Sequence, residues 1–337
     1  MNVLAIGGTG FIGSHVAHLL IEQGHDVAIL HRGTTVAGLS TVVRHIHGSR
    51  DAIADVQPEL ARFKPEVVLD VIPYTERQAR ELVQVFSGLA ERIVVISSAD
   101  VYRNYDGFRG KAPAPPDPVP LSEEAPLRET LYPYRGYGLP FEWADDYDKI
   151  LVERIVLGDA DLPATVLRLA AVYGPGDKQN RIGVYLDRMS AQRRVQMTRE
   201  QSAWRWTRGY VENVATAIAL AVVDNRSAAR VYNLGEESAL TEREWVEEIG
   251  KAVSWAGDVV HVPKDDLPEH LRQPFDFRYE LMTDTTRIRE ELGYSESVSR
   301  EEALARTVEW ERSRRRESER VDRQQCRTDV TAGRNTV

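Results

Sequence analysis

Residues 1 to 13 have the sequence MNVLAIGGTGFIG, and this stretch decides the fold. The short apolar run Asn2 to Ile6 predicts a buried strand, and the apolar residues that follow the stretch at helical spacing predict an amphipathic helix. Between them lie Gly7, Gly10 and Gly13, which suit a tight turn and a close approach of the backbone to a pyrophosphate. The free amides and the positive dipole end of the helix favour the same anion. The motif therefore predicts a dinucleotide-binding strand, turn and helix.

Short apolar, β-branched runs alternate with helical patterns along the first half of the chain. This alternation predicts βαβ units whose parallel sheet is covered by helices on both faces. We therefore expect an α/β protein with a doubly wound parallel sheet of the Rossmann type. The expected strands cover Asn2 to Ile6, Asp26 to Leu30, Thr41 to Ile46, Glu66 to Val71, Arg92 to Ile96 and Ala164 to Leu169.

The rhythm of strands and helices changes after about residue 175. We expect residues 1–175 to form the dinucleotide-binding domain, with residues 205–235 returning to it, and residues 176–310 to form a smaller C-terminal substrate lobe. From Glu311 large apolar side chains are nearly absent, so burial cannot repay the entropy lost on ordering that segment. Residues 311–337 are therefore expected to be a flexible tail.

The net charge of -9 over 337 residues argues against the broad basic surface that binding to nucleic acid requires. The single cysteine, Cys326, excludes an internal disulfide and a cysteine-based metal cluster, and we expect no metal site. No apolar run reaches the roughly 18 residues needed to cross a bilayer, and the first residues lack the cationic leader of a signal peptide. These features predict a cytoplasmic protein whose partner is a small molecule, with neither nucleic acid nor membrane.

The residues that close the second expected strand bear on the choice between NAD and NADP. An acidic side chain there accepts hydrogen bonds from the ribose 2′-hydroxyl of NAD and repels the 2′-phosphate of NADP. This chain has His31 and Arg32 instead, and an arginine can grip a phosphate with two nitrogens. We therefore favour NADP as the cofactor, with NAD as the alternative.

Several motifs occur in the order and spacing found in extended short-chain dehydrogenases/reductases. On these motifs the chain, over about residues 1–310, resembles the NAD(P)-dependent epimerase/dehydratase family of nucleotide-sugar enzymes. The resemblance implies an oxidoreductase that acts on a sugar nucleotide or a similar polyhydroxylated small molecule. The motifs are GGTGFIG, SSADVY (Ser97 to Tyr102), LRLAAVYGPG (Leu167 to Gly176), VYNLG (Val231 to Gly235) and TDTTRIREELGY (Thr283 to Tyr294).

Members of that family use a serine, a tyrosine and a lysine, and the resemblance assigns the serine to Ser98 and the lysine to Lys149. In relatives the tyrosine exchanges a proton with the substrate oxygen, while the lysine lowers the pKa of the tyrosine and holds the nicotinamide ribose. We expect the cofactor to contact Gly7, Thr9, Gly10, Phe11, Ile12, Gly13, His31, Arg32, Asp51, Ile72, Ser97 and Lys149.

The tyrosine position of the family motif is occupied by Asp145. On a helix Asp145 and Lys149, four residues apart, share one face and are expected to form an ion pair. Tyr147 then points to nearly the opposite face, and replaces the missing phenol only if the start of the helix is distorted. Asp100 stands where dehydratase relatives place a catalytic glutamate. We therefore expect a carboxylate, Asp145 or Asp100, to take the proton, with Ser98 holding the substrate oxygen.

Substrate contacts are expected from Tyr102 and from the segment WRWTRGYV, residues 204–211, which supplies Arg205 and Arg208 as candidates for binding a diphosphate. A different reading stays open, in which the chain keeps the dinucleotide fold without redox turnover and serves as a regulatory or RNA-associated binding protein. Relatives often pair through a helix bundle that includes the equivalent of residues 144–157, so a homodimer also stays open.

Overall fold

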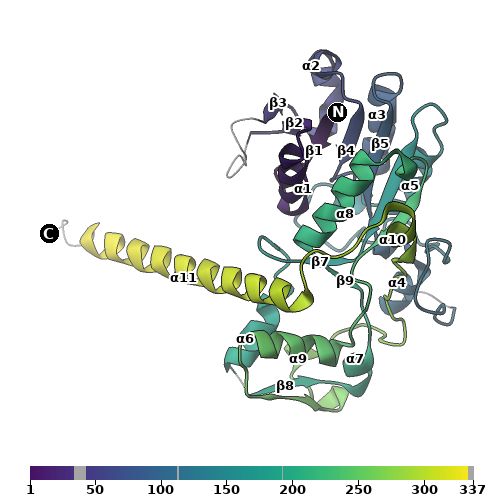
Figure 1. Cartoon of the computed structure of the whole chain (residues 1–337). Helices are drawn as coiled ribbons and strands as arrows, with labels where there is room; N and C mark the ends of the chain where they lie inside the picture. Colours follow the sequence, from purple (N-terminus) through teal and green to yellow (C-terminus); the bar gives the residue numbers. More distant parts are fainter. Residues whose placement is uncertain (34–42, 112–113, 192, 333–337) are drawn as a thin grey trace.

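The computed structural model describes residues 1–33, 43–111, 114–191 and 193–332, with side chains up to Glu317. Its centre is a seven-stranded sheet in the order β10-β6-β5-β4-β1-β2-β3, in which every neighbouring pair is parallel (Figure 1). The predicted doubly wound α/β architecture is confirmed. The strands are β1 (Asn2–Ile6), β2 (Asp26–His31), β3 (Arg44–His47), β4 (Val67–Asp70), β5 (Arg92–Ser98), β6 (Ala164–Leu169) and β10 (Val231–Leu234).

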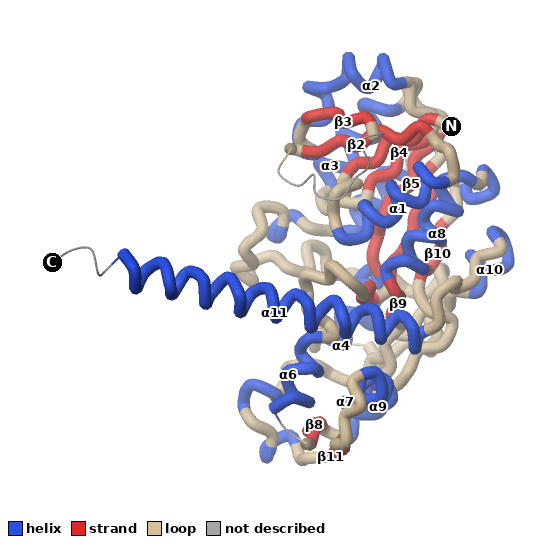
Figure 2. Tube along the Cα trace, turned by 60° about the vertical axis from the view of Figure 1, so that its left-hand side comes forward, coloured by secondary structure: helices blue, strands red, loops and turns tan. Residues whose placement is uncertain are grey.

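Helices cover both faces of this sheet, so the strands need apolar side chains on both sides (Figure 2). Side chains of β1 alternate between two cores: Val3 and Ala5 pack on one face, and Leu4 and Ile6 on the other. One face is covered by α1 (Phe11–Glu22) and α8 (Val211–Val223), and the other by α2 (Gln57–Phe63), α3 (Glu76–Phe86) and α5 (Lys149–Leu157).

The direction in which strands are added reverses at β1, because β2 lies on one side of it and β4 on the other. In open parallel sheets the crevice at the carboxyl ends of the strands beside this reversal is the ligand site. The glycine turn follows β1 directly, so the topology brings it to that crevice. The segments after β2, β4 and β5 border the same edge.

A smaller lobe lies below the sheet in the view of Figure 1. Between its helices α7 and α9 the chain runs back to the sheet, where β9 (Arg208–Tyr210) pairs with β7 (Ala171–Tyr173) and β10 becomes the edge strand. Helix α10 (Thr286–Leu292), which the sequence assigned to the lobe, lies against β10 instead. The lobe consists of α6 (Gly183–Ala191), β8 (Arg194–Met197), α7 (Arg199–Ala203), α9 (Glu242–Ala252) and β11 (Asp258–His261), with β8 and β11 paired in parallel.

The last helix, α11 (Arg300–Ala332), projects from the body as a single rod (Figures 1 and 2). The prediction of a tail without secondary structure from Glu311 onward is thus wrong, because residues 311–332 continue the helix. Glu311 is buried and pairs with Arg314 at 2.9 Å, while Arg315 pairs with Asp187 of α6 at 2.6 Å. Arginine and glutamate are good helix formers that also pair across one turn, so a segment poor in apolar residues can still be helical.

In the described part of the chain, no helix combines the length and the apolar character that crossing a membrane requires. Although α11 is long, it is rich in arginine and glutamate.

Two truncations test whether the start of α11 contributes to stability. Ending the chain after Trp310 removes the buried Glu311 and the Arg315–Asp187 pair. We expect the melting temperature to fall by several degrees, since each kcal/mol lost corresponds to roughly 2–4 °C in a domain of this size class. A chain that ends at Glu317 keeps both contacts and should melt like the full chain. Calorimetry that gives one melting temperature for both truncations contradicts this docking role.

Candidate functional site

The glycine turn after β1 has a geometry that larger residues cannot adopt. Gly7 has φ +84°, in the left-handed region, and Ile72 packs over it. A Cβ atom on Gly13 would lie 2.3 Å from the carbonyl oxygen of Gly7, so a side chain at that position is excluded. The amide of Gly10 donates to the same carbonyl at 3.1 Å and closes the turn. The backbone is therefore drawn tightly together directly in front of α1.

The N-terminus of α1 fits an anionic group. Gly10 caps the helix without a side chain, and no acidic residue stands in the first turn. The first amides and the positive end of the dipole are therefore open to a ligand. Phe11 and Ile12 of the first turn are partly exposed, as is Thr9 before it. A pyrophosphate suits this cradle, because glycine backbone and helix amides bind phosphate without any lysine.

A cleft of about 770 Å³ opens beside this turn, at the carboxyl ends of β2, β3 and β4. Predicted cofactor residues on its wall include Arg32, Asp51 and Ile72. Arg32 is exposed and forms no ion pair with any residue that the structure describes, whereas Asp51 accepts hydrogen bonds from Arg77 at 2.9 Å and Gln78 at 2.7 Å. The opposite wall is aromatic, with Tyr132, Phe141 and Trp143 among its residues.

The side chain of His31 turns toward the neighbouring strand. Its Nδ1 accepts a hydrogen bond from the Gly33 amide at 3.0 Å, so its Nε2 carries the proton and lies 2.8 Å from Nδ1 of His45. Burial, followed by the nearby His45 and His47, lowers the pKa of His31. Both ring nitrogens thus already have partners in the protein, and the cofactor contact of His31 stays a prediction.

Helix α5 begins at Lys149, four residues later than the family motif suggests. Asp148 caps it, with φ -160° and its Oδ1 accepting the amide of Ile150 at 2.9 Å. The same carboxylate pairs with Arg128 at 2.7 Å, and neither side chain is exposed to solvent. Arg128 also donates to the backbone carbonyl of Asp100 at 3.0 Å. This ion pair therefore joins the start of α5 to the segment that follows β5.

The late start of α5 overturns two predictions. Tyr147 has φ -64° and ψ 123°, which is extended backbone, so helical facing does not apply between Asp145 and Lys149. Asp145 is exposed and accepts the amide of Gly136 at 2.9 Å, and the expected pair with Lys149 does not form. The distortion that Tyr147 required is present, and the phenol turns into the protein interior.

Tyr147 and Asp100 form the centre of a buried polar cluster. The Tyr147 hydroxyl donates to Oδ2 of Asp100 at 2.7 Å, and the Tyr134 hydroxyl lies 3.4 Å from the same oxygen. Within the described part of the chain, Oδ1 of Asp100 has no hydrogen-bond partner. Burial raises the pKa of Asp100, and burial together with this carboxylate raises the pKa of Tyr147 well above its ordinary value. Tyr147 is therefore protonated, and Asp100 is a stronger base than an exposed carboxylate.

Lys149 lies next to this cluster. Its ammonium donates to the carbonyls of Pro73 at 2.9 Å and Ile96 at 2.7 Å, and it stands 6.0 Å from the centre of the Tyr147 ring. Burial lowers the pKa of Lys149 to about 8, although nearby carboxylates act in the opposite direction and raise it. Ser98 is partly exposed, and its hydroxyl accepts the amide of Asp100 at 3.2 Å. Four of the predicted catalytic residues thus come together, and Asp145 does not.

Two motif residues that were expected to bind ligands form hydrogen bonds within the protein. The Ser97 hydroxyl donates to Glu153 at 2.5 Å in the interior. Tyr102 is fully buried, and its hydroxyl donates to Asn233 at 2.5 Å and accepts from Arg168 at 3.1 Å. Both hydroxyls therefore already have partners within the protein, and the cofactor contact of Ser97 and the substrate contact of Tyr102 stay predictions.

The two arginines expected to bind a diphosphate differ in their surroundings. Arg208 is buried against the Trp245 ring at 4.4 Å and pairs with Glu242 at 2.5 Å, so its charge is compensated within the lobe. Arg205 is half exposed, with Glu280 3.7 Å away. Of the two, only Arg205 presents a guanidinium to solvent.

Sequence reasoning missed Tyr74 and Arg128 altogether. Tyr74 stacks on Trp143 with ring centres 4.3 Å apart, and its ring centre lies 5.0 Å from the Lys149 ammonium. Tyr134 belongs to the aromatic run Tyr132, Tyr134 and Tyr137, and its hydroxyl bonds to that of Tyr105 at 2.8 Å. The aromatic run upstream of Lys149 was the one available signal, whereas Arg128 carried none.

Comparisons with known proteins identify the family and the fold. The model of the NAD dependent epimerase/dehydratase family matches residues 3–235. A UDP-N-acetyl-alpha-D-glucosaminuronate decarboxylase from Bacillus cytotoxicus is 25% identical over 333 residues, covering 91% of this chain and 96% of the relative. The solved UDP-glucose 4-epimerase of Thermotoga maritima with UDP-glucose has a TM-score of 0.66 at 21% identity over 93% of this chain and 99% of its own. MoeE5 in complex with UDP-glucuronic acid and NAD gives 0.64 at 23% identity, with the same coverage.

Replacing Lys149 with methionine should change how stability depends on pH. The pKa of Lys149 is about 8 in the folded protein and 10.5 as the ordinary value, so between these values the unfolded chain binds more protons at this position. The contribution of Lys149 therefore makes the wild-type protein more stable as the pH rises. We expect the unfolding free energy of wild type, relative to Lys149→Met, to increase from about pH 7 to about pH 10 in urea titrations.

The matched control for this experiment is Lys251→Met, because Lys251 lies on the surface beside Glu248. That variant should show no such increase relative to wild type. A wild-type advantage over Lys149→Met that stays constant with pH would mean that the ammonium is well hydrated.

Proposed function

The chain belongs to the NAD dependent epimerase/dehydratase family of enzymes, and on this basis we propose that it oxidises and reduces a ring carbon of a sugar nucleotide with NADP. The match to the family model over residues 3–235 supports the enzyme class. Similar proteins support the sugar-nucleotide substrate: one is a decarboxylase of a UDP-linked sugar, and two solved structures hold UDP-glucose or UDP-glucuronic acid. The observation that carries the chemical proposal is the 2.7 Å hydrogen bond from Tyr147 to Asp100 beside Lys149.

The residues around the cleft fit a nicotinamide dinucleotide. The Gly7–Gly13 turn and the free end of α1 would hold the pyrophosphate, and Arg32 would hold the adenosine side. The chemistry that bound NADP supplies is reversible hydride transfer at the sugar carbon. Lys149, with its charge buried beside Tyr147, would bind the nicotinamide ribose and favour a negative substrate oxygen.

The preference for NADP rests on the charge next to β2. No carboxylate ends that strand, and the exposed Arg32 is not paired with any described residue. Asp51, an acid on the cleft wall, is engaged by Arg77 and Gln78. A guanidinium without a competing carboxylate suits a 2′-phosphate, which carries more negative charge than the ribose hydroxyl of NAD.

The proton step uses two groups in series. In the direction of oxidation, the substrate hydroxyl gives its proton to the Tyr147 oxygen as Tyr147 passes its own proton to Oδ2 of Asp100. The raised pKa of Asp100 makes this carboxylate a competent acceptor, so the phenol never needs to ionise by itself. In reduction the two protons move back. Ser98, a partly exposed residue, would donate to the substrate oxygen and orient it.

Tyr147→Phe tests the proton step, because it keeps the ring and removes the transferable proton. We expect turnover to fall by about 10²-fold to 10⁴-fold, with dinucleotide affinity unchanged. The assay incubates the protein with NADP⁺ or NAD⁺ and a panel of UDP- and dTDP-sugars, and follows the absorbance of the reduced nicotinamide and the products by mass spectrometry.

Asp145→Asn is the matched control for Tyr147→Phe, since its carboxylate is exposed and held by a backbone amide. Its turnover should equal that of wild type, whereas Asp100→Asn should lose turnover like Tyr147→Phe. Loss of turnover in Asp145→Asn with retention in Tyr147→Phe would overturn the proposed relay.

Arg32→Ala tests the choice of cofactor. We expect calorimetry to show tighter binding of NADP⁺ than of NAD⁺ to the wild type, and the substitution should weaken NADP⁺ roughly 10-fold to 100-fold while leaving NAD⁺ unchanged. Arg80→Ala is the control, because Arg80 pairs with Glu76 on an exposed helix face. Equal affinities for both dinucleotides, unaffected by Arg32→Ala, would show that the arginine is a surface cation without a role in binding.

A further inference from the structure

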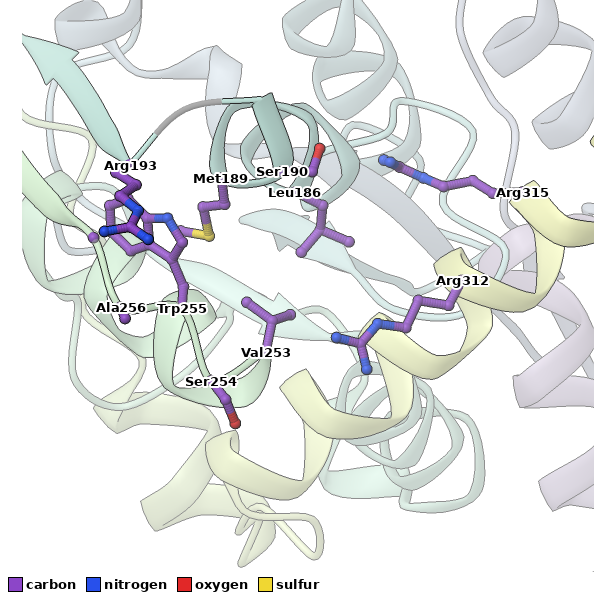
Figure 3. Close-up of a pocket in the computed structure, with 11 residues that line it drawn as sticks. Leu186, Met189, Ser190, Arg193, Val253, Ser254, Trp255, Ala256, Arg312 and Arg315 are labelled. Atoms are coloured by element: carbon purple, nitrogen blue, oxygen red, sulfur yellow. The ribbon is translucent and has the colours of Figure 1, made fainter.

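A second cavity lies where the smaller lobe meets α11, and it shares no residue with the cleft described above. Its volume is about 510 Å³. Figure 3 shows side chains reaching it from α6, from the segment after α9 and from Arg312 and Arg315 of α11. The lining residues are Leu186, Met189, Ser190, Arg193, Val253, Ser254, Trp255, Ala256, Gly257, Arg312 and Arg315.

The floor of this cavity is apolar and held in place. Leu186 and Met189 are buried in the core of the lobe, and Val253 and Trp255 pack against that core. A Cβ atom on Gly257 would lie 2.2 Å from the indole of Trp255, so the ring rests directly on the glycine backbone.

The rim of the cavity is cationic. Arg193 is one of the lining residues, and Figure 3 shows Arg312 and Arg315 extending from α11. Arg315 is paired with Asp187 at 2.6 Å, but Arg193 and Arg312 form no ion pair with a described residue. Two uncompensated guanidinium groups beside one cavity are notable in a chain with a net charge of -9. The site therefore attracts anions against the overall charge of the protein.

The same cavity does not suit a sugar nucleotide. Apart from the three arginines, its polar side chains are Ser190 and Ser254, which cannot satisfy the many hydroxyls of a sugar. An aromatic or branched apolar body, by contrast, gains from contact with Leu186, Met189 and Trp255. We propose that this cavity binds a small organic anion, in which an aromatic body lies on the apolar floor and one carboxylate or sulfonate meets Arg312 and Arg193.

The probe for this site is 8-anilino-1-naphthalenesulfonate, an aromatic body with one sulfonate whose fluorescence rises in apolar surroundings. We expect saturable binding of one probe molecule per chain, unchanged by saturating NADP⁺. The neutral analogue N-phenyl-1-naphthylamine, which lacks only the sulfonate, should bind about tenfold more weakly or worse. Equal affinity of the two compounds would remove the role of the arginines.

Two variants locate the probe. Arg312→Glu reverses the charge on the exposed helix surface and should weaken the sulfonate about tenfold or more, while Met189→Trp fills the floor and should block both compounds. Arg316→Glu makes the same charge change one turn further along α11, where Arg316 pairs with Glu309, and should bind like wild type. Binding that survives Arg312→Glu unchanged, that is displaced by NADP⁺, or that is absent from the wild type overturns the proposal.

Discussion

The buried ion pair between Arg128 and Asp148 sets the geometry on which the site depends. Both side chains are excluded from solvent, and Arg128 also donates to the backbone carbonyls of Asp100 and Thr130. Breaking such a pair leaves an uncompensated charge in the interior, which costs about 3–5 kcal/mol. Because Asp148 caps α5 as well, one interaction determines both where the helix begins and how the segment after β5 lies against it.

A second polar network holds α5 from its other side. Glu153 pairs with Arg168 of β6 at 2.7 Å and accepts the Ser97 hydroxyl of β5, and Arg168 in turn reaches Tyr102, which donates to Asn233 of β10. Burying a network of polar side chains costs free energy unless every side chain in it has a hydrogen-bond partner. In this network each of them has one. The hydroxyls of Ser97 and Tyr102 thus belong to the polar framework that holds α5, the helix that begins at Lys149.

Burial shifts the three titratable groups of the site in the directions that reduce charge. It raises the pKa values of Asp100 and Tyr147 and lowers that of Lys149. A phenol bonded to a basic carboxylate can exchange its proton over a short distance without creating a free phenolate. The Asp100 carboxylate is therefore placed to accept the phenol proton in the relay that we propose.

The sequence by itself determined the sheet, the glycine turn and the positions of Ser98, Asp100 and Lys149, because strand periodicity and the steric demands of a tight turn are local properties. It did not determine the role of Tyr147. Whether a helix starts at residue 145 or at Lys149 depends on Arg128, a partner distant along the chain whose contact leaves no periodic trace. The same holds for Tyr102 and His31, whose partners come from other strands. Only the tertiary structure decides such cases, because a polar side chain binds whichever partner the fold brings nearest in the interior.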